Sequence, residues 1–369
     1  MTGRGVSEDA AVEPRMGAAE ALGVAGEAAG AEVLGAGVPG GVVPLVQAAR
    51  LPAPAAPASP SSSVRLRMVT SVRCLAVMTS GRRTSGKSHS VSRVVVHGRS
   101  GARRNMLRLM THRPVRIGLQ LQPQHADYPT IRRTAAEAEE LGVDVLFNWD
   151  HFYPLYGDPD GPHFECWTML GAWAEATSRV QIGALVTCNS YRNPELLADM
   201  ARTVDHISDG RLILGIGSGW FEKDYQEYGY EFGTAGGRLD ALAEALPRIE
   251  TRLGKLNPPP TRDIPVLIGG GGEKKTLRLV AKHADIWHSF GDAETLRHKL
   301  GVLRQHCADA GRDPGEIEIS SGVQADSKPE AAAGLREQGV SLFTLGIGGP
   351  KPDLAPLRDW LAWRDEQNA

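Results

Sequence analysis

Short apolar runs alternate with longer amphipathic stretches throughout residues 113–369, and this alternation constrains the fold more than any other feature of the sequence. The short runs are typical of buried strands, and the longer stretches repeat their apolar residues at helical spacing. The predicted strands are residues 115–121, 144–148, 180–187, 211–216, 265–268, 285–290, 316–323 and 342–347. The predicted helices are residues 128–141, 164–177, 194–207, 237–253, 273–283, 293–310, 329–338 and 353–365.

Eight strand-then-helix units in about 250 residues favour a single (β/α)8 barrel, the TIM-barrel architecture. A doubly wound sheet is the alternative, but it usually places a glycine fingerprint after its first strand. Here the first predicted strand ends in Gln120-Leu-Gln-Pro, without such a fingerprint. Because (β/α)8 barrels carry their catalytic and binding groups at the C-terminal ends of the strands, we expect the functional residues there.

Residues 1–112 differ in composition from the predicted barrel. All 21 aromatic residues of the chain lie at or after Tyr128. Residues 1–112 contain 14 Lys and Arg against 6 Asp and Glu, whereas residues 113–369 contain 27 against 37. A stretch without aromatic side chains rarely offsets the entropy of ordering its backbone, so we expect a low-complexity, disordered leader or an over-extended start. A transit peptide is the alternative, and Met106 and Met110 would serve as natural starts.

The predicted barrel has a net charge of −10, which argues against nucleic acid or an anionic membrane as its main partner. The apolar run 33–49 is interrupted by Gly and Pro and is shorter than the ~20 residues of a membrane span. The four cysteines form no CxxC pair, so a reducing cytoplasm is the expected location. No metal site is predicted, since His163 and Glu165 lie close in sequence but lack an evident third ligand.

An aspartate and a histidine stand side by side just after the predicted strand 144–148. Asp150 and His151 place a carboxylate beside an imidazole, and such a pair can hold a titratable proton near neutral pH, as general acid–base chemistry requires. The alternative is a loop histidine packed among aromatic residues, with an aspartate that caps a turn. Their place at the expected rim makes Asp150 and His151 candidate catalytic residues.

Small polar residues end the next predicted strand, 180–187. Thr187, Cys188 and Asn189 offer hydrogen bonds to a heterocycle and leave room for it, so they are candidate cofactor-binding residues. Cys188 could also be a nucleophile, but a buried small residue with ordinary thiol chemistry is the commoner case.

Glycines and an aromatic residue follow the predicted strand 211–216. The Gly-x-Gly-x-Gly sequence that ends at Gly219 lets the backbone approach a ligand closely, although it is weak evidence for a dinucleotide site in this context. Trp220 is a candidate wall of the cofactor site or a plug of the barrel mouth. Glu222 is an available catalytic carboxylate, although acids at exposed helix starts are common.

Four glycines between a predicted strand and a predicted helix form the strongest local motif. The motif consists of Gly269, Gly270, Gly271, Gly272 and Glu273, followed by Lys274 and Lys275. Successive backbone N–H groups and a helix N-terminus together form a cradle for phosphate. The alternative is a flexible turn before a solvated helix face. We interpret the motif as a phosphate site.

Together these segments resemble the luciferase-like monooxygenase superfamily, in particular its actinobacterial branch that uses the deazaflavin coenzyme F420. The stretches that carry the resemblance are Asn-Trp-Asp-His-Phe from Asn148, Leu-Val-Thr-Cys-Asn-Ser-Tyr-Arg-Asn-Pro from Leu185, Asp-His-Ile-Ser-Asp-Gly-Arg-Leu-Ile-Leu-Gly-Ile-Gly-Ser-Gly-Trp-Phe-Glu from Asp205, and Pro-Val-Leu-Ile-Gly-Gly-Gly-Gly-Glu from Pro265. They occur in the family's order over roughly residues 113–350, and residues 1–112 have no place in the pattern.

The resemblance implies a barrel that holds F420 or FMN at the strand C-termini, with the phosphate in the loop 269–273. It implies that the turn 187–189 supports the ring, often through a bulge or a non-prolyl cis peptide, and that His151 assists proton or hydride traffic beside it. Sugar-phosphate dehydrogenases of this superfamily carry a catalytic Glu at the end of the fourth strand. Trp220 occupies that position here, which puts such a substrate in doubt and leaves Glu222 as the available substitute.

These residues predict an F420-dependent oxidoreductase that transfers a hydride between the coenzyme and a small organic substrate. Arg192, Lys274 and Lys275 are candidates to accommodate the coenzyme's phosphate and glutamyl tail. An FMNH2-dependent monooxygenase is the nearer alternative, and a non-catalytic F420-binding carrier or sensor is the more distant one. Dimers are common in the superfamily, so a homodimer is possible.

Overall fold

The computed structural model describes residues 113–369, and the leader predicted for residues 1–112 lies outside the described residues. The strands are β1 (Arg116–Leu121), β2 (Val145–Asn148), β3 (Gln181–Ala184), β4 (Thr187–Cys188), β5 (Leu212–Gly217), β6 (Val266–Gly269), β7 (Ile286–Ser289), β8 (Glu318–Val323) and β9 (Val340–Ile347). The helices are α2 (Tyr128–Leu141), α3 (Cys166–Ala176), α4 (Pro194–Ile207), α5 (Glu222–Tyr228), α6 (Ala235–Leu253), α7 (Thr276–His283), α8 (Ala293–Ala310), α9 (Ala333–Glu337) and α10 (Ala355–Asn368), with short 3-10 turns η1 (Asn189–Tyr191), η2 (Pro314–Glu316) and η3 (Pro329–Ala332).

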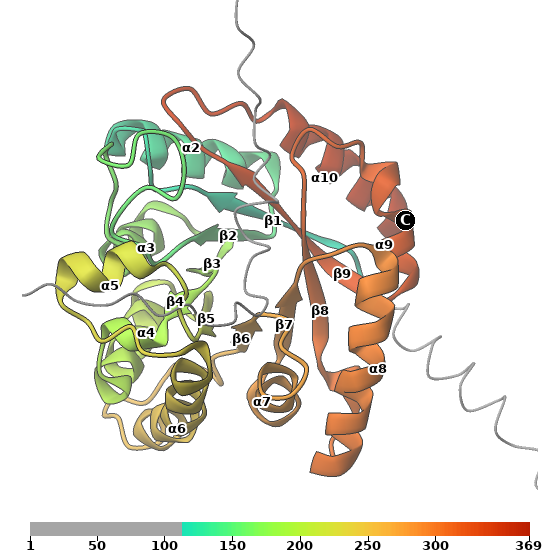
Figure 1. The fold of residues 1–369 in the computed structure, drawn as a ribbon. Coiled ribbons are helices and arrows are strands. Elements are labelled where there is room, and N and C mark those ends of the chain that lie inside the picture. The colour runs from blue at the N-terminus through green and yellow to red at the C-terminus, as the bar shows by residue number, and fades with distance from the viewer. Residues whose placement is uncertain (1–112) are drawn as a thin grey trace, which may run out of the picture. The chain divides into compact units, whose positions relative to one another are not determined.

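The paired strands of the described chain run parallel and close into a barrel surrounded by helices (Figure 1). β1 lies between β2 and β9, and the order continues through β8, β7, β6 and β5. β3 pairs with β2 on one side and with β5 on the other, which closes the sheet. The short β4 also pairs with β5, so β3 and β4 together form the third strand of the barrel. The predicted (β/α)8 barrel is confirmed.

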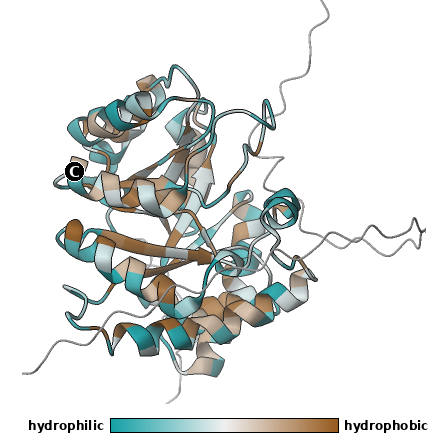
Figure 2. Cartoon of the chain, turned by 90° about the vertical axis from the view of Figure 1, so that its left-hand side faces the viewer, coloured by the Kyte–Doolittle hydropathy of each residue, from teal (hydrophilic) through white to brown (hydrophobic). Residues whose placement is uncertain are grey.

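A plug of apolar side chains fills the interior of the barrel. Its buried members come from several strands: Val145, Phe147, Leu185, Ile213, Leu267, Ile286 and Leu342. The alternate side chains of the strands face outward and pack beneath the helices in a second, larger core. Figure 2 shows the strands largely in brown and the helices banded with teal, as this two-layer burial requires. The plug leaves room for a ligand only at an end of the barrel.

Helix-capping residues explain why several predicted helix bounds are correct. Asp127 accepts a hydrogen bond from the backbone of Thr130 at the start of α2, and Gly142 ends that helix with a φ of 98°. Asn193 caps α4 in the same way, and Pro194 follows at its first position.

The predicted strand 180–187 is wrong as a single element. The chain leaves the sheet after Ala184 and returns to it at Thr187, and the peptide bond between Leu185 and Val186 is cis although no proline is involved. The resemblance implies a bulge or a non-prolyl cis peptide in this region, and the cis bond lies immediately before Thr187.

The helices α5, α7 and α9 also depart from the predictions. The segment 221–236, which lies between the predicted strand 211–216 and the predicted helix 237–253, contains the helix α5. The helix predicted from residue 273 begins at Thr276, because the glycines and the residues after them form turns first. The helix predicted for 329–338 is the turn η3 followed by the short helix α9. The first two of these differences lie in segments that carry candidate site residues.

Candidate active site

The C-terminal ends of the barrel strands bring the sequence-predicted residues to one end of the molecule. The residues that end or follow a strand in this way are Asp150, His151, Thr187, Cys188, Asn189, Gly219, Trp220, Gly269, Gly270, Gly271, Gly272 and Glu273. Glu222 lies slightly further on, at the start of α5. The expected rim of the barrel is therefore where these residues gather.

His151 is held by a carboxylate that the sequence does not single out. Its Nδ1 donates a hydrogen bond to Oδ2 of Asp224 over 2.7 Å. The imidazole side chain is 11% exposed, and its Nε2 has no hydrogen-bond partner among residues 113–369. Since Nδ1 is engaged, Nε2 is the ring nitrogen left to exchange a proton with a ligand.

Asp224 is fully buried and accepts four hydrogen bonds. Besides His151, its donors are the backbone amides of Phe152 and Tyr153 and the hydroxyl of Tyr191, which lies 2.9 Å from Oδ2. Burial, with the charge and hydrogen bond of Asp224, raises the pKa of Tyr191 and keeps its hydroxyl protonated as a donor. Asp224 thus fixes both the ring and the loop that carries it.

Sequence reasoning misses Asp224 because it predicts no helix between residues 216 and 237. Asp224 follows β5 near the rim where functional residues are expected, so a signal was present. The helical conformation of α5 determines which acidic side chain is buried. Asp224 is buried, whereas Glu222 is exposed and accepts a hydrogen bond from Gln226 over 3.1 Å. A catalytic role for Glu222 stays a prediction.

Asp150 faces away from His151 and binds Arg192 instead. Both oxygens of Asp150 accept from the guanidinium, with Nη2 3.0 Å from Oδ1, and Oδ2 also accepts from the backbone amide of Cys188 over 2.9 Å. The side chains of Asp150 and Arg192 are 0% and 9% exposed. The carboxylate that bonds to His151 is therefore that of Asp224 and not that of its sequence neighbour Asp150. Arg192, predicted near the coenzyme's anionic tail, is engaged within the protein.

Aromatic rings surround His151. The ring centroids of Phe221, Trp220 and Trp149 lie 5.5, 5.7 and 6.3 Å from the imidazole, each at a steep angle to it. Trp220 is 40% exposed, so it forms a wall at the surface rather than a buried plug. This wall excludes water from part of the imidazole and offers apolar surface to a substrate.

Thr187, Cys188 and Asn189 are all buried beside the cis bond. The hydroxyl of Thr187 accepts from the indole N–H of Trp167 over 3.2 Å. The thiol of Cys188 lies 3.3 Å from the hydroxyl of Tyr225, and burial raises its pKa to about 11. A thiol with this pKa is protonated at neutral pH, which argues against the nucleophilic role weighed from the sequence.

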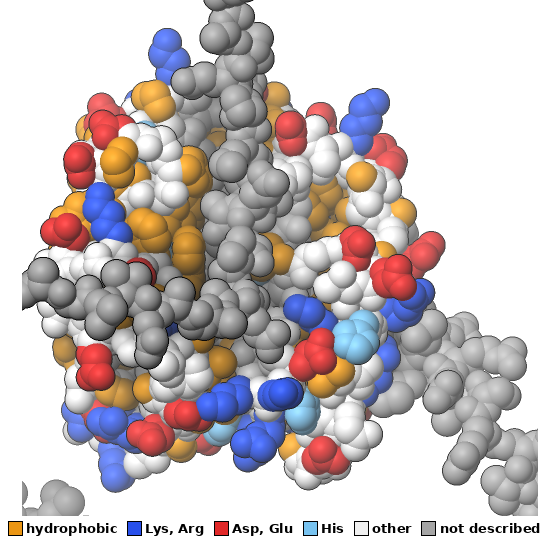
Figure 3. All heavy atoms as spheres, viewed as in Figure 1, with side chains coloured by type: hydrophobic (Ala, Val, Ile, Leu, Met, Phe, Trp, Pro, Cys, Tyr) orange, Lys and Arg blue, Asp and Glu red, His pale blue; other side chains and the backbone are white. Residues whose placement is uncertain are grey.

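The glycine loop after β6 lies against α8. A side chain at Gly271 would collide with Nζ of Lys299, and a side chain at Gly272 would come within 2.8 Å of Thr276 Oγ1. Gly270 has a φ of 123°, which side chains rarely tolerate. Figure 3 shows basic and histidine side chains gathered where α7 and α8 meet. The loop therefore combines close backbone approach with nearby positive charge.

Lys299 is a second residue that sequence reasoning misses. It lies on α8, far along the chain from the glycines, and it has no hydrogen bond or ion pair with another residue of the described barrel. Lys275, which the sequence favours, donates to Asp240 over 2.6 Å and to the carbonyl of Gly236. Glu273 accepts from His298 over 3.1 Å. Lys275 is thus engaged with α6, whereas Lys299 is a cation beside Gly271 without a partner in the described barrel.

Acidification is expected to destabilise the fold through one buried histidine and one partly buried histidine. Burial lowers the pKa of His163 to about 4 and that of His288 to about 3, from an ordinary value of 6.5. Both stay neutral in the folded protein while the unfolded chain takes up protons below pH 6.5. Their stabilisation is therefore present above pH 6.5 and is lost as the pH falls towards 4, at up to about 1.4 kcal/mol per pH unit for each histidine.

Urea unfolding between pH 7 and 4.5 measures this loss. We expect His288→Leu to flatten the decline of the free energy of unfolding, whereas replacing the exposed His206 with leucine should leave its slope unchanged. If the free energy of unfolding falls equally steeply with pH in His288→Leu and in the wild type, then buried, neutral His288 does not cause the loss of stability in acid.

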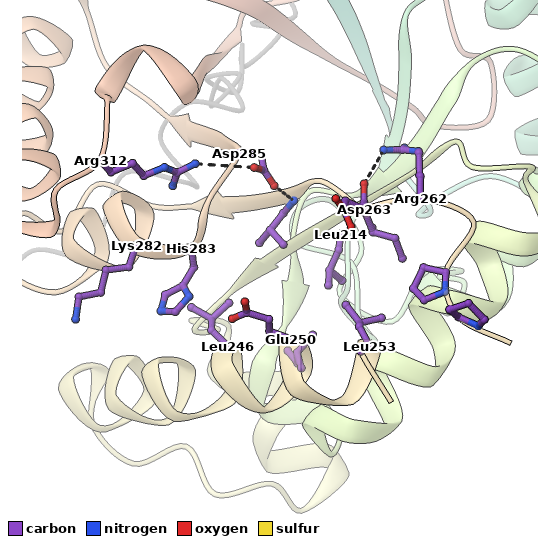
Figure 4. A pocket seen from close by; sticks show the side chains of 16 residues that line it. Leu214, Leu246, Glu250, Leu253, Arg262, Asp263, Lys282, His283, Asp285 and Arg312 are labelled. Atoms are coloured by element: carbon purple, nitrogen blue, oxygen red, sulfur yellow. Dashed lines mark hydrogen bonds and ion pairs between the residues drawn. The ribbon is translucent and has the colours of Figure 1, made fainter. Parts of the chain in front are cut away.

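A cavity of about 810 Å³ opens elsewhere, between α6 and α7 (Figure 4). Leu246, Glu250 and Leu253 of α6 face it from one side, and Lys282 and His283 of α7 from the other. Its remaining walls come largely from residues that precede or begin β6 and β7, so it belongs to the N-terminal end of the barrel. Since barrel enzymes carry their chemistry at the opposite end, this cavity is separate from the candidate active site.

Among residues 113–369, no group of three or more His, Cys, Asp and Glu side chains is placed to hold a metal ion. None of the helices in this part of the chain combines the length and apolar character that a membrane span requires.

The structure is a parallel (β/α)8 barrel. A histidine held by an aspartate and a glycine loop lie together at the C-terminal ends of its strands, where barrel enzymes carry their active sites. Residues 108–338 match the family model described as luciferase-like monooxygenase, so the chain belongs to this family. Family membership supports an oxidoreductase or monooxygenase, and one relative and one structural neighbour are named for their dependence on F420.

Individual relatives share moderate sequence identity with the chain. An uncharacterized protein of Mycobacterium tuberculosis (strain ATCC 25618 / H37Rv) is 28% identical over 247 residues, which cover 61% of this chain and 80% of that one. The F420-dependent glucose-6-phosphate dehydrogenase of Amycolatopsis mediterranei (strain U-32) is 32% identical over 168 residues, 41% of this chain and 48% of that enzyme. An F420-dependent secondary alcohol dehydrogenase in complex with an F420-acetone adduct matches with a TM-score of 0.61 and 18% identity, over 70% of this chain and all of that one. The structural match supports the fold.

Proposed function

We propose that this protein is an F420-dependent oxidoreductase that transfers a hydride between the coenzyme and a small organic substrate. The observation that carries the proposal is the pair of His151 and Asp224, which leaves Nε2 of a buried imidazole without a protein partner. This nitrogen lies at the end of the barrel where the glycine loop is found. Relatives named for F420 dependence support the choice of coenzyme.

The residues at this end of the barrel suit a phosphate-bearing, planar coenzyme. The glycine loop 269–272 allows backbone N–H groups to approach a phosphate, and Lys299 supplies a cation beside Gly271. The buried segment 187–189 follows the cis bond and is the expected support of the ring. When bound, F420 carries two electrons as a hydride and reacts poorly with oxygen, because carbon replaces the flavin N5 nitrogen.

The protein's own residues would then orient the substrate and move a proton. Asp224 fixes the ring of His151 through Nδ1, so Nε2 gives or takes the proton at the substrate oxygen as hydride transfer proceeds. The rings of Trp149, Trp220 and Phe221 limit the water around that nitrogen. Trp220 also occupies the position at which related sugar-phosphate dehydrogenases carry a glutamate, which favours a different substrate.

Removing the cation beside the glycine loop is expected to weaken coenzyme binding. We expect Lys299→Ala to raise the dissociation constant of F420 about tenfold, since a charge-assisted hydrogen bond is lost. The matched control is Lys282→Ala, which alters a lysine at the N-terminal cavity. Fluorescence titration also compares the effect of Lys299→Ala on the binding of FMN with its effect on riboflavin, which lacks the phosphate. The effect on FMN should be the larger one. A Lys299→Ala effect that is as large for riboflavin as for FMN would contradict the phosphate role.

Oxygen consumption separates the proposal from its flavin alternative. An F420-dependent oxidoreductase is expected to bind F420 and to oxidise or reduce it without oxygen uptake. An FMNH2-dependent monooxygenase would instead consume oxygen in proportion to the reduced flavin supplied. An F420-binding carrier or sensor would bind the coenzyme but leave it unchanged with every substrate tested.

A further inference from the structure

His288 lies on the inner face of the barrel near the C-terminal end of β7. Ile286 belongs to the apolar plug, and side chains two positions apart on a strand face the same side. In register, His288 pairs with Gly269 of β6 and with Ser320 of β8. Its imidazole therefore lies directly above the plug, one strand from the start of the glycine loop.

One nitrogen of this imidazole has no partner. Nδ1 forms a hydrogen bond with Oγ of Ser320 over 2.8 Å, whereas Nε2 is buried and unpaired among the described residues. His288 as a whole is 2% exposed. A buried polar atom without a partner costs free energy, so its presence calls for an explanation such as a ligand.

The other unpaired buried side-chain atoms of the described barrel lie elsewhere. They belong to Arg116 at the start of β1, Trp173 of α3, Arg202 and Asp205 of α4, and Trp360 of α10. Among residues 113–369, His288 is thus the position where such an atom lies inside the barrel at the end that carries the candidate site.

The surroundings of Nε2 suit a neutral partner. The ring of Phe290 meets the imidazole edge-on at 4.9 Å between centroids, and a side chain at Gly322 would lie 3.9 Å from Nε2. Burial lowers the pKa of His288 to about 3, so the imidazole is uncharged at neutral pH. A neutral imidazole without a nearby cation offers little to an anion but binds a hydroxyl or carbonyl oxygen well.

His288 also lies between the parts of the chain expected to hold a coenzyme. The amide of Gly270 donates to the carbonyl of His288 over 3.0 Å, which joins it to the glycine loop. A side chain at Gly269 would come within 3.0 Å of Val186, the residue that precedes the expected ring support. His288 of β7 is paired with Gly269 of β6, and adjacent strands are ~4.8 Å apart. A ligand that reaches from Val186 to the glycine loop therefore passes close to His288.

We propose that His288 is a coenzyme-binding residue whose Nε2 hydrogen-bonds to a neutral oxygen of a bound deazaflavin or flavin, either a ring carbonyl or a ribityl hydroxyl. Both coenzymes carry such oxygens between the ring and the phosphate. Ser320 acts as a positioning residue, because its bond to Nδ1 orients the ring. The inference rests on the proposed function, since it requires a coenzyme of this class at the C-terminal end of the barrel.

Fluorescence titration of the full chain and of His288→Leu tests the proposal, with F420, FMN, riboflavin and lumiflavin as ligands. We expect about tenfold weaker binding by the variant of whichever coenzyme the wild type binds. If weakening extends to lumiflavin, which lacks the ribityl chain, the partner is a ring carbonyl. If it is confined to ligands with a ribityl chain, the partner is a hydroxyl.

Two further variants distinguish a ligand contact from a packing role. His288→Gln keeps a hydrogen-bonding group and is expected to bind the coenzyme more tightly than His288→Leu does. The control His283→Leu, at the opposite cavity, should bind as the wild type does. The urea midpoint of His288→Leu at pH 7 should fall only slightly, because the variant loses the bond from Nδ1 to Ser320 but also removes the unpaired Nε2.

Wild-type affinity in His288→Leu would overturn the proposal, and so would equal weakening of binding in the leucine and glutamine variants together with a large fall in the urea midpoint of both. If the wild type binds none of the ligands, the proposed function fails as well. If the wild type binds but His288→Leu binds equally tightly, only the role of His288 fails.

Discussion

His151→Ala is expected to lower kcat/KM for hydride transfer by a factor of about 10² to 10⁴, because the substrate oxygen loses its proton donor or acceptor. The dissociation constant of F420 should change little, since the substitution leaves the glycine loop and Lys299, which are proposed to bind the phosphate, in place. The measurement follows the absorbance of oxidised F420 with the best substrate from a panel of alcohols and ketones.

Variants of α5 serve as comparisons for His151→Ala. Asp224→Asn should also lower turnover, since the asparagine holds the imidazole less firmly, but by a smaller factor. Glu227→Ala alters an exposed acid of the same helix and should leave turnover unchanged. Glu222→Gln decides whether that exposed carboxylate contributes. Full turnover in His151→Ala would remove the histidine from the mechanism.

Arg192→Met is expected to lower the free energy of unfolding by about 3–5 kcal/mol, because it leaves the buried carboxylate of Asp150 without its cation. Asp150 is 0% exposed, and its remaining described hydrogen bond comes from the amide of Cys188. Urea unfolding at pH 7 measures the change. Since Asp150 also fixes Cys188, the variant should weaken coenzyme binding as well.

A surface pair provides the matched control for Arg192→Met. Arg248 binds Glu195 through two hydrogen bonds, but both side chains are more than 40% exposed. Solvent screens such a pair, so Arg248→Met should cost no more than about 1 kcal/mol. The double variant Asp150→Asn/Arg192→Met should recover part of the lost stability. A cost for Arg192→Met as small as that for Arg248→Met would refute the buried pair.

Much of the barrel is predictable from the sequence because its signals are local. The helices α2, α4 and α8 have the bounds that the sequence predicts, since caps such as Asp127 and stops such as Gly311 lie within a few residues of each end. The interruption between β3 and β4 is not predictable from apolar pattern, because Leu185 and Val186 continue the apolar run through the break.

The candidate site is predictable in position but not in its contacts. The strand-end rule places His151 and the glycine loop correctly because it depends only on fold class. The partner of His151 is 73 residues away in sequence, on a helix whose seven residues carry acids on several faces. Lys299 reaches Gly271 only through the packing of α8. Such pairings depend on three-dimensional packing, which one sequence does not reveal.

Fluorescence titration of the purified full chain with F420 and, separately, with FMN tests the central claim most directly. We predict saturable binding of F420 that is markedly tighter than that of FMN, and weaker binding of F420 to the Lys299→Ala variant. Selective binding of FMN, or binding of neither coenzyme, would contradict the assignment of this barrel as an F420-dependent oxidoreductase.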